Sequence, residues 1–323
     1  MTLLYASPRF LEHDTGYHVE TAARLTHIAR MLADSGWSER CLRPTWTAAT
    51  AGQLAAVHTE AHIARIERLA ASGGGQIDPD TVVSPASFEV ARLAAGAACD
   101  AVSRVLGGQD STALCLVRPP GHHALAHRAM GFCLFGNVAV AARWAIDQFG
   151  LDRVLVVDWD VHHGNGTQDI FYDDERVGLF SIHRWPFYPG TGAADETGRG
   201  AGLGATRNLP TAFGTPRREY LARFRDELGD FAARIKPQLV LISAGFDSHA
   251  ADPIGSLGLE TEDFAELTET VLAVARDFAA GRVVSVLEGG YNPPVLADSV
   301  AAHLAVLWEG LGNRAKQSPP WML

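Results

Sequence analysis

The sequence predicts a single α/β domain whose central sheet is mainly parallel and is flanked by helices on both faces. Six short apolar, β-branched runs are typical of buried strands: Leu3–Tyr5, Ala113–Val117, Val154–Val157, Val177–Ile182, Leu239–Ser243 and Val283–Leu287. Amphipathic stretches with helical spacing lie between them: Ala22–Leu32, Phe88–Leu106, Asn137–Phe149, Pro216–Ile235 and Thr261–Ala279. Apolar strands that alternate with helices are a feature of parallel sheets covered on both sides. We therefore expect one domain over residues 1–323, with a core from about 5 to 310 and a C-terminal tail over 311–323.

Composition excludes several classes of protein. The net charge of −10 argues against nucleic acid as a partner, because such proteins need basic surface. The sequence has no run of about 18 apolar residues, so no membrane span is predicted. The N-terminal MTLLYASPRF lacks the pattern of a signal peptide. The four cysteines form no CxxC pair, which favours buried thiols in a reducing compartment. We expect a cytoplasmic protein, with homo-oligomer formation left open.

Polar segments, four of them with glycine, lie at or directly after the ends of five of the predicted strands. They are Arg118–His123, Asp158–Asn165, Ser181–His183, Ala244–His249 and Glu288–Asn292. Ligands of such sheets bind beyond the carboxyl ends of the strands. The sequence therefore predicts a functional site where these segments meet.

The segment VVDWDVHHGNGTQ, residues 156–168, is a candidate metal half-site. If the chain stays extended, Asp158, Asp160 and His162 share one face, and His163 lies on the other. Carboxylate oxygens and imidazole nitrogen suit zinc, iron or manganese. A hydrogen-bonded buried cluster is the alternative interpretation.

A third ligand is expected from ISAGFDSHAADP, residues 242–253. Asp247 follows a buried strand and an Ala-Gly pair, so it can turn into the site, and His249 is a competitor. Asp252, which precedes Pro253, is more typical of a turn.

Two further motifs supply candidate catalytic groups. RPPGHHA, residues 118–124, holds His122 and His123 after a stiff proline turn, and we interpret this pair as general base and general acid. LEGGYN, residues 287–292, places Tyr291 where its hydroxyl can donate a hydrogen bond to a carbonyl oxygen or oxyanion.

Six ordered motifs together resemble the histone deacetylase and acetylpolyamine amidohydrolase family, and the class II-like bacterial members most. They are RPPGHHA, GFCLFGNVAVAA, VVDWDVHHGNGTQDIFY, SIHRWPFYPGTG, SAGFDSHAADP and LEGGYN, and the likeness runs from about Tyr5 to Trp308. The resemblance implies the arginase/deacetylase fold. It also implies a metal, zinc or alternatively ferrous iron, held by Asp160, His162 and Asp247.

The resemblance also assigns catalytic roles. His123 matches the main general base and acid, and His122 matches its partner, which Asp158 orients. Asn165 stands beside His123 where many class I relatives have an aspartate. Tyr291 matches the tyrosine that polarises the scissile carbonyl.

Substrate and potassium contacts are implied in the same way. Gly131, Phe132 and Tyr188 match the walls of the acyl-lysine tunnel, and Ile254 lies at its rim. Asp80, with Asp78 as the alternative, matches the rim acid that grips the substrate backbone. A structural potassium ion is expected, largely on backbone carbonyls, at Asp158, Asp160, His162, Ser181 and Ile182.

The expected reaction is hydrolysis of N-ε-acyl-lysine in a protein or peptide, or of a small acylated amine. Polyamine-selective relatives carry a rim glutamate where this chain has Ile254, so acyl-lysine is favoured over acetylpolyamine. Short-chain esters share the same chemistry. A two-manganese ureohydrolase is disfavoured, because Gly164 and His249 replace carboxylates that a second ion needs. A non-catalytic docking module is disfavoured because every catalytic position is intact.

Overall fold

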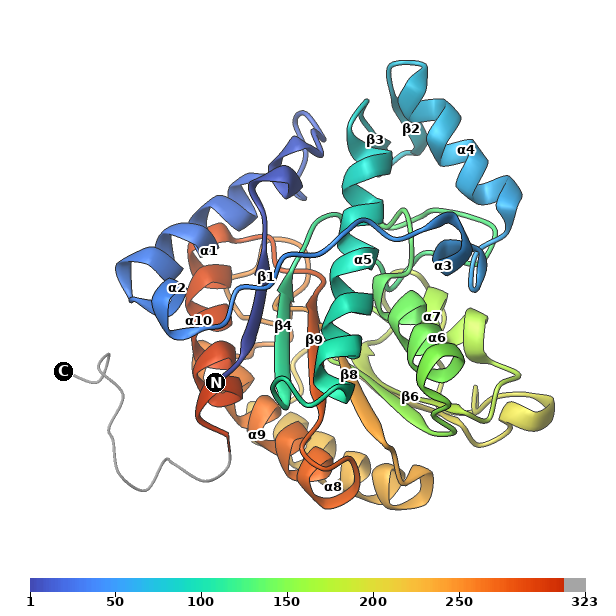
Figure 1. Cartoon of the computed structure of the whole chain (residues 1–323). Coiled ribbons are helices and arrows are strands. Elements are labelled where there is room, and N and C mark those ends of the chain that lie inside the picture. Colours follow the sequence, from blue (N-terminus) through green and yellow to red (C-terminus); the bar gives the residue numbers. More distant parts are fainter. Residues whose placement is uncertain (311–323) are drawn as a thin grey trace.

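The computed structural model describes residues 1–310, so the predicted tail over 311–323 lies outside the described residues. A seven-stranded sheet forms the centre of the domain, and every neighbouring pair of its strands is parallel (Figure 1). In spatial order the strands are β1 (Leu3–Ala6), β4 (Thr112–Leu116), β9 (Val283–Leu287), β8 (Leu239–Ala244), β5 (Val154–Asp158), β6 (Val177–Arg184) and β7 (Thr206–Thr211). The parallel α/β architecture predicted from the sequence is confirmed.

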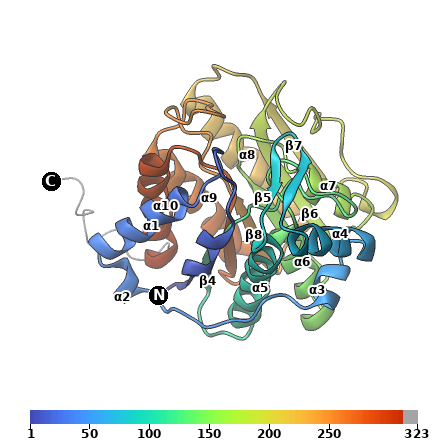
Figure 2. The ribbon, with the colours of Figure 1, turned by 90° about the horizontal axis from the view of Figure 1, so that it is seen from above.

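Helices cover both faces of this sheet (Figure 2). One layer contains α1 (Ala23–Asp34), α8 (Arg217–Ile235), α9 (Thr261–Phe278) and α10 (Pro293–Glu309). The other contains α5 (Ser87–Leu106), α6 (Asn137–Phe149) and the short α7 (Asn165–Phe171). The central strands β4, β5, β8 and β9 are wholly buried, as expected for strands enclosed on both sides.

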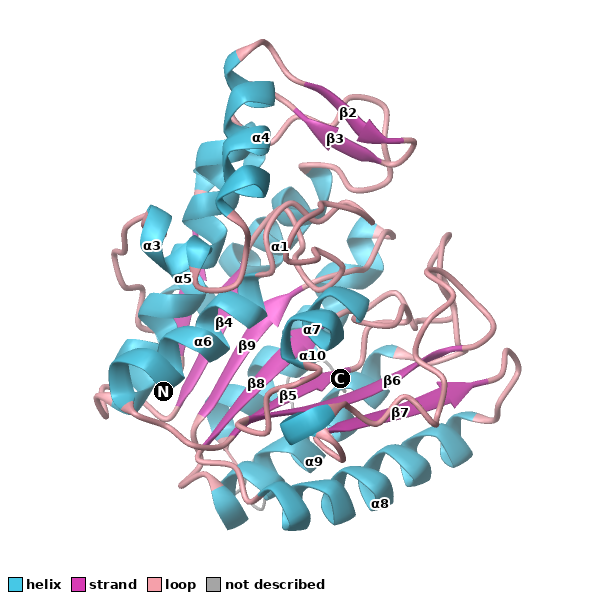
Figure 3. Ribbon diagram, turned by 90° about the vertical axis from the view of Figure 1, so that its right-hand side faces the viewer, coloured by secondary structure: helices cyan, strands magenta, loops and turns pink. Residues whose placement is uncertain are grey.

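Several elements were not among those predicted. The helices that were not predicted are α2 (Trp37–Arg40), α3 (Ala51–Ala55), α4 (Glu60–Ala71), α7 and α10, and the 3₁₀ turns η1 (Pro8–Glu12) and η2 (Gly200–Gly202) were not predicted either. Strand β7 was not predicted, because its sequence, TRNLPT, is not an apolar run. Its Pro210 is tolerated because β7 lies at the edge of the sheet. An antiparallel hairpin, β2 (Gly75–Asp78) and β3 (Thr81–Val83), stands beside α4, away from the main sheet (Figure 3).

All four cysteines are buried and unpaired, as expected. Among residues 1–310, no helix combines the length and the apolar character that crossing a bilayer requires.

Candidate active site

Four neighbouring strands deliver the predicted reactive residues to one edge of the sheet. The strands β4, β9, β8 and β5 are consecutive in the sheet, so the segments that follow them are also neighbours. His122 and His123 follow β4, Asp160 and His162 follow β5, Asp247 follows β8, and Tyr291 follows β9. The expected convergence at the carboxyl ends is therefore observed.

Asp160, His162 and Asp247 form a compact buried group. Their candidate ligand atoms all lie within 4.8 Å of one another. Nδ1 of His162 lies 3.0 Å from Asp160 Oδ1 and 3.2 Å from Asp247 Oδ2. One imidazole nitrogen and two carboxylates are a donor set suited to a divalent transition metal.

The local charge also fits a cation at this position. Asp247 Oδ2 is buried and makes no hydrogen bond, although His162 is within ion-pair distance. Burial and the charge of Asp160 raise the pKa of Asp247 to about 7. Burial opposes protonation of His162, but the adjacent carboxylates of Asp160 and Asp247 outweigh it and raise the pKa of His162 to about 9. A bound cation would relieve this excess of buried negative charge.

The path of the chain differs from the extended one assumed for VVDWDVHHGNGTQ. Strand β5 ends at Asp158, and irregular backbone follows until α7 begins at Asn165. Asp160 Oδ1 accepts the backbone N–H of His162, and Asp247 Oδ1 accepts that of Val161. These bonds, rather than strand alternation, place the side chains of Asp160 and His162.

Glycines leave room for the clustered carboxylates. A Cβ atom on Gly289 would overlap the Oδ2 atoms of Asp247 and Asp160, and one on Gly245 would also overlap Asp160. The backbone N–H of Gly289 donates to Asp160 Oδ2 over 2.8 Å. The glycines are therefore needed for close approach of the backbone to the acids.

The two adjacent histidines have different partners. His122 donates its Nδ1–H to Asp158 Oδ2 over 3.0 Å, and His123 donates its Nδ1–H to Asn165 Oδ1 over 2.7 Å. Each bond leaves Nε2 available for proton transfer. His122 Nε2 lies 3.8 Å from Asp160 Oδ1, so the pair adjoins the candidate ligands.

Burial and nearby charges shift the pKa values of His122 and His123 in opposite directions. Burial alone would lower the pKa of His122, but the charges of Asp160 and Asp158 outweigh it and raise that pKa well above its usual value. Burial lowers the pKa of His123 well below its usual value, and the neighbouring His122 and His162 lower it further. His122 is therefore suited to stay protonated, and His123 is suited to accept a proton.

Tyr291 and aromatic side chains lie around the histidines. The Tyr291 ring contacts Phe132 edge-on, with centroids 5.6 Å apart, and the Arg24 guanidinium lies 5.1 Å from the Tyr291 centroid. Tyr188 meets the His123 ring edge-on at 5.2 Å. A Cβ atom on Gly131 would overlap the His123 ring. Gly131, Phe132 and Tyr188 thus lie beside the catalytic candidates, in positions consistent with a tunnel wall.

The hairpin β2–β3 brings the acidic rim candidates to the same region. Thr81 Oγ1 accepts the backbone N–H of Phe132 over 3.2 Å, and the Asp80 carbonyl lies 3.2 Å from His18 Nε2. The pKa of Tyr188 is raised chiefly by burial, and the charges of Asp80 and Asp78 raise it further. Ile254 is half-buried, and its backbone N–H donates to Asp252.

Two competing histidines do not belong to the ligand group. His163 lies between the Thr191 hydroxyl, 2.8 Å from Nδ1, and Gln168 Oε1, 3.0 Å from Nε2. Nδ1 of His249 accepts the backbone N–H of Ala251 over 3.0 Å.

Ser181 and Ile182 are buried in β6, and Ser181 is paired in register with Asp158 of β5.

Two residues of the site were not singled out from the sequence. Phe187 stacks on His162 with centroids 5.2 Å apart, and only its place after a strand end hinted at this contact. The buried Glu288 carboxylate accepts the backbone N–H groups of Gly121 and His122 over 2.6 and 3.2 Å. Glu288 therefore connects β9 to the segment that carries the histidine pair.

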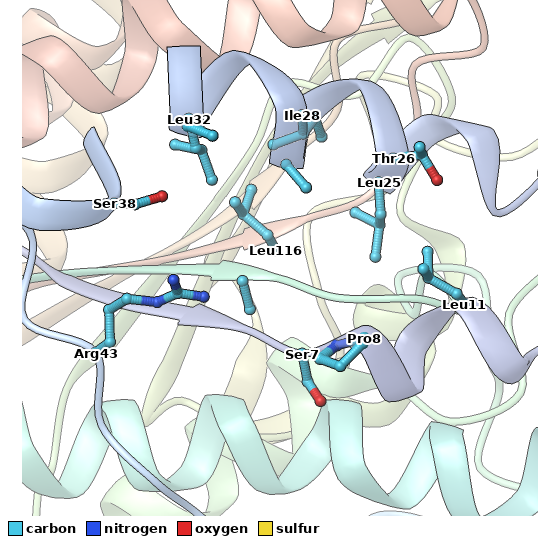
Figure 4. A pocket seen from close by; sticks show the side chains of 13 residues that line it. Ser7, Pro8, Leu11, Leu25, Thr26, Ile28, Leu32, Ser38, Arg43 and Leu116 are labelled. Carbon is cyan, nitrogen blue, oxygen red and sulfur yellow. The ribbon is translucent and has the colours of Figure 1, made fainter. Parts of the chain in front are cut away.

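A separate cavity of about 400 Å³ lies between α1 and strand β1 (Figure 4). Its apolar wall includes Leu25, Ile28, Leu32 and Leu116, and Arg43 lies at one side. No residue of the candidate active site lines this cavity.

The fold and site together define an α/β enzyme of the hydrolytic type, with paired histidines beside a candidate metal site. The family model described as "Histone deacetylase domain" matches residues 18–307. The chain therefore belongs to the histone deacetylase family, whose deacetylases and amidohydrolases are hydrolases.

Individual relatives agree with this assignment. A histone deacetylase-like amidohydrolase of Pseudomonas aeruginosa is 38% identical over 304 residues, covering 94% of this chain and 79% of that protein. The human polyamine deacetylase HDAC10 is 42% identical over 313 residues, which cover 93% of this chain but 46% of that protein. The crystal structure of the HDA15 HD domain superposes with a TM-score of 0.90 and 36% identity, covering 96% of this chain and 89% of that one.

Proposed function

We propose that the protein hydrolyses the amide of N-ε-acyl-lysine, with acetyl-lysine as the favoured substrate. The observation that carries the proposal is the juxtaposition of the Asp160–His162–Asp247 group with two histidines whose pKa values shift in opposite directions. Zinc is the proposed ion and ferrous iron the alternative, since the donor set accepts both. Bound there, the ion would activate a water molecule and polarise the amide carbonyl.

The chain's own residues would carry the proton transfers. His123, with its Nδ1–H fixed by Asn165, presents Nε2 as the base that takes a proton from the attacking water. The same nitrogen then delivers the proton to the leaving amine. His122, held by Asp158, supplies a positive charge beside the developing negative charge. The Tyr291 hydroxyl donates a hydrogen bond to the oxygen that becomes an oxyanion.

Substrate recognition is proposed for residues around the entrance. Gly131, Phe132 and Tyr188 would flank the aliphatic lysine chain, and Asp80 would accept hydrogen bonds from the substrate backbone. A structural potassium ion is proposed at Asp158, Asp160, His162, Ser181 and Ile182. The register that pairs Asp158 with Ser181 supports it, because it brings the two backbones together.

Acetylpolyamine is the second candidate substrate. The similarity to a protein named polyamine deacetylase favours it. Ile254 argues against it, because this half-buried apolar side chain cannot pair with the second ammonium group of a polyamine.

The four unpaired cysteines support a cytoplasmic location.

A substrate panel on protein of measured metal content tests the proposal. An acetyl-lysine peptide, acetylspermidine and a short-chain ester are compared at equal concentration. We expect the highest kcat/KM for the peptide, and an Ile254→Glu variant should shift the ratio toward acetylspermidine. A large preference of the unaltered protein for acetylspermidine would overturn the lysine assignment. Inertness of metal-loaded protein toward all three would overturn the proposed function.

A further inference from the structure

Tyr291 sits at the end of a segment that needs external support. It follows Gly289 and Gly290, and Gly290 has a φ of 120°, a conformation that side-chain-bearing residues rarely adopt. The backbone N–H of Tyr291 donates to Asp252 Oδ2 over 2.7 Å. This bond joins residues 39 positions apart.

The second oxygen of Asp252 holds the rim of the site. Oδ1 accepts the backbone N–H groups of Ile254 and Gly255, over 2.9 and 3.0 Å. Asp252 as a whole residue is 9% exposed. All three donors are backbone groups, so one carboxylate joins residues 252–255 to the tyrosine segment.

Other contacts also hold that segment. Arg24 donates from Nε to the Gly290 carbonyl over 2.6 Å, and its guanidinium lies over the Tyr291 ring. Asn292 donates from Nδ2 to the Ala251 carbonyl over 2.9 Å, a second bond between the rim and tyrosine segments. The Asp252 bond differs from both because it reaches the backbone of Tyr291 itself.

We propose that Asp252 is a positioning residue: its carboxylate fixes the backbone of Tyr291 and residues 254–255 together, and so sets where the tyrosine hydroxyl lies relative to the substrate rim. The inference rests on the proposed function, in which that hydroxyl donates to the reacting oxygen. Asp252 acts through Tyr291 and does not itself touch the substrate.

Asp252→Asn is the sharpest substitution, because it preserves size. Its amide oxygen can still accept from Ile254 and Gly255, but its NH₂ group then faces the N–H of Tyr291. Asn292→Ala is the matched control, since it removes a bond between the same two segments without touching the Tyr291 backbone.

Metal-loaded proteins are compared by kcat, KM and melting temperature. We expect Asp252→Asn to lower kcat at least tenfold, with KM changed less than about twofold and metal content unchanged, whereas Asn292→Ala stays within about twofold of the parent. In a Tyr291→Phe background, Asp252→Asn should have little further effect on kcat, because both changes remove the same interaction. Additive losses, or a lower melting temperature with kcat preserved, would overturn the positioning role.

Amide hydrogen exchange decides the question independently of activity. In Asp252→Asn, peptides covering residues 288–296 should exchange at least tenfold faster than in the parent and in Asn292→Ala. Unchanged exchange would contradict the inference. An inert parent protein with faster exchange in Asp252→Asn would overturn the proposed function and leave Asp252 as the support of this segment.

Discussion

His122 and His123 lie with ring centroids 4.0 Å apart, yet one is bonded to a carboxylate and the other to an amide. Asp158 stabilises the protonated form of His122, whereas Asn165 orients His123 without adding charge. The chain thus places a proton-rich and a proton-poor imidazole side by side. The different roles proposed for the two rings agree with this contrast, to which the charge of Asp160 near His122 and the burial of His123 also contribute.

Asn165→Asp should move the pH dependence of kcat/KM. A carboxylate 2.7 Å from His123 Nδ1 would favour the protonated ring and raise its pKa. A general base works only when neutral, so the acidic limb of the profile should shift to higher pH. Asp169→Asn is the control, because it changes an exposed charge on the same helix and should leave the limb in place. An unmoved limb in Asn165→Asp would remove His123 as the base.

Tyr291→Phe should retain metal and lose most turnover. The ring contacts with Phe132 and Arg24 survive the change, so the fold and the metal content should be preserved. Loss of an oxyanion donor typically costs about 3 kcal/mol, or roughly a hundredfold in kcat. Steady-state kinetics on metal-quantified protein measures this loss. Unchanged turnover would show that the hydroxyl takes no part in the reaction.

Gly289→Ala should impair metal binding. The added methyl group would overlap the inner oxygens of Asp160 and Asp247, so these carboxylates must move apart. We expect at least a tenfold weaker affinity for zinc in competition with a chelator. Gly229→Ala is the control, because this position in α8 has nothing within 4 Å of the added carbon. Equal affinities in the two variants would contradict the packing account.

Buried neutral histidines should make the fold sensitive to acid. His58 Nε2 accepts the backbone N–H of Gly136 over 2.9 Å, and burial lowers the pKa of His58 to about 4. The unfolded chain binds a proton below about pH 6.5, whereas the folded chain resists it until about pH 4, so stability falls as the pH falls through this window. At pH 5 the loss is about 2 kcal/mol for this one histidine.

Denaturant unfolding at pH 7 and pH 5, with chelator present, measures that loss without metal linkage. His58→Gln should lose less stability between the two pH values than the parent protein loses. If both proteins showed the same difference in the free energy of unfolding, His58 would not be a source of the acid sensitivity.

The sequence was informative where function depends on strand order. Apolar runs located six of the seven strands of the main sheet, and the rule about carboxyl ends then brought Asp160, Asp247 and the histidine pair to one edge. The motifs added the pairing of His122 with Asp158 and of His123 with Asn165, and both bonds are present.

Long-range contacts were less accessible to prediction. Asp252 was interpreted as a turn residue, and its bonds to Ile254 and Gly255 agree with that. Its bond to Tyr291 could not be foreseen, because nothing local to either residue specifies the other. The extended path expected after Asp158 was wrong for a related reason, since side-chain to backbone bonds from Asp160 and Asp247 shape this segment.

Zinc titration of metal-free protein, followed by hydrolysis of an acetyl-lysine peptide, tests the central claim most directly. We predict that activity rises from zero and saturates at one ion per chain, and that Asp247→Ala, which removes one of the three proposed ligands, neither binds the ion tightly nor gains activity. Full activity in the metal-free protein, or the same activation in Asp247→Ala, would contradict the assignment of Asp160, His162 and Asp247 as the metal site that supports hydrolysis.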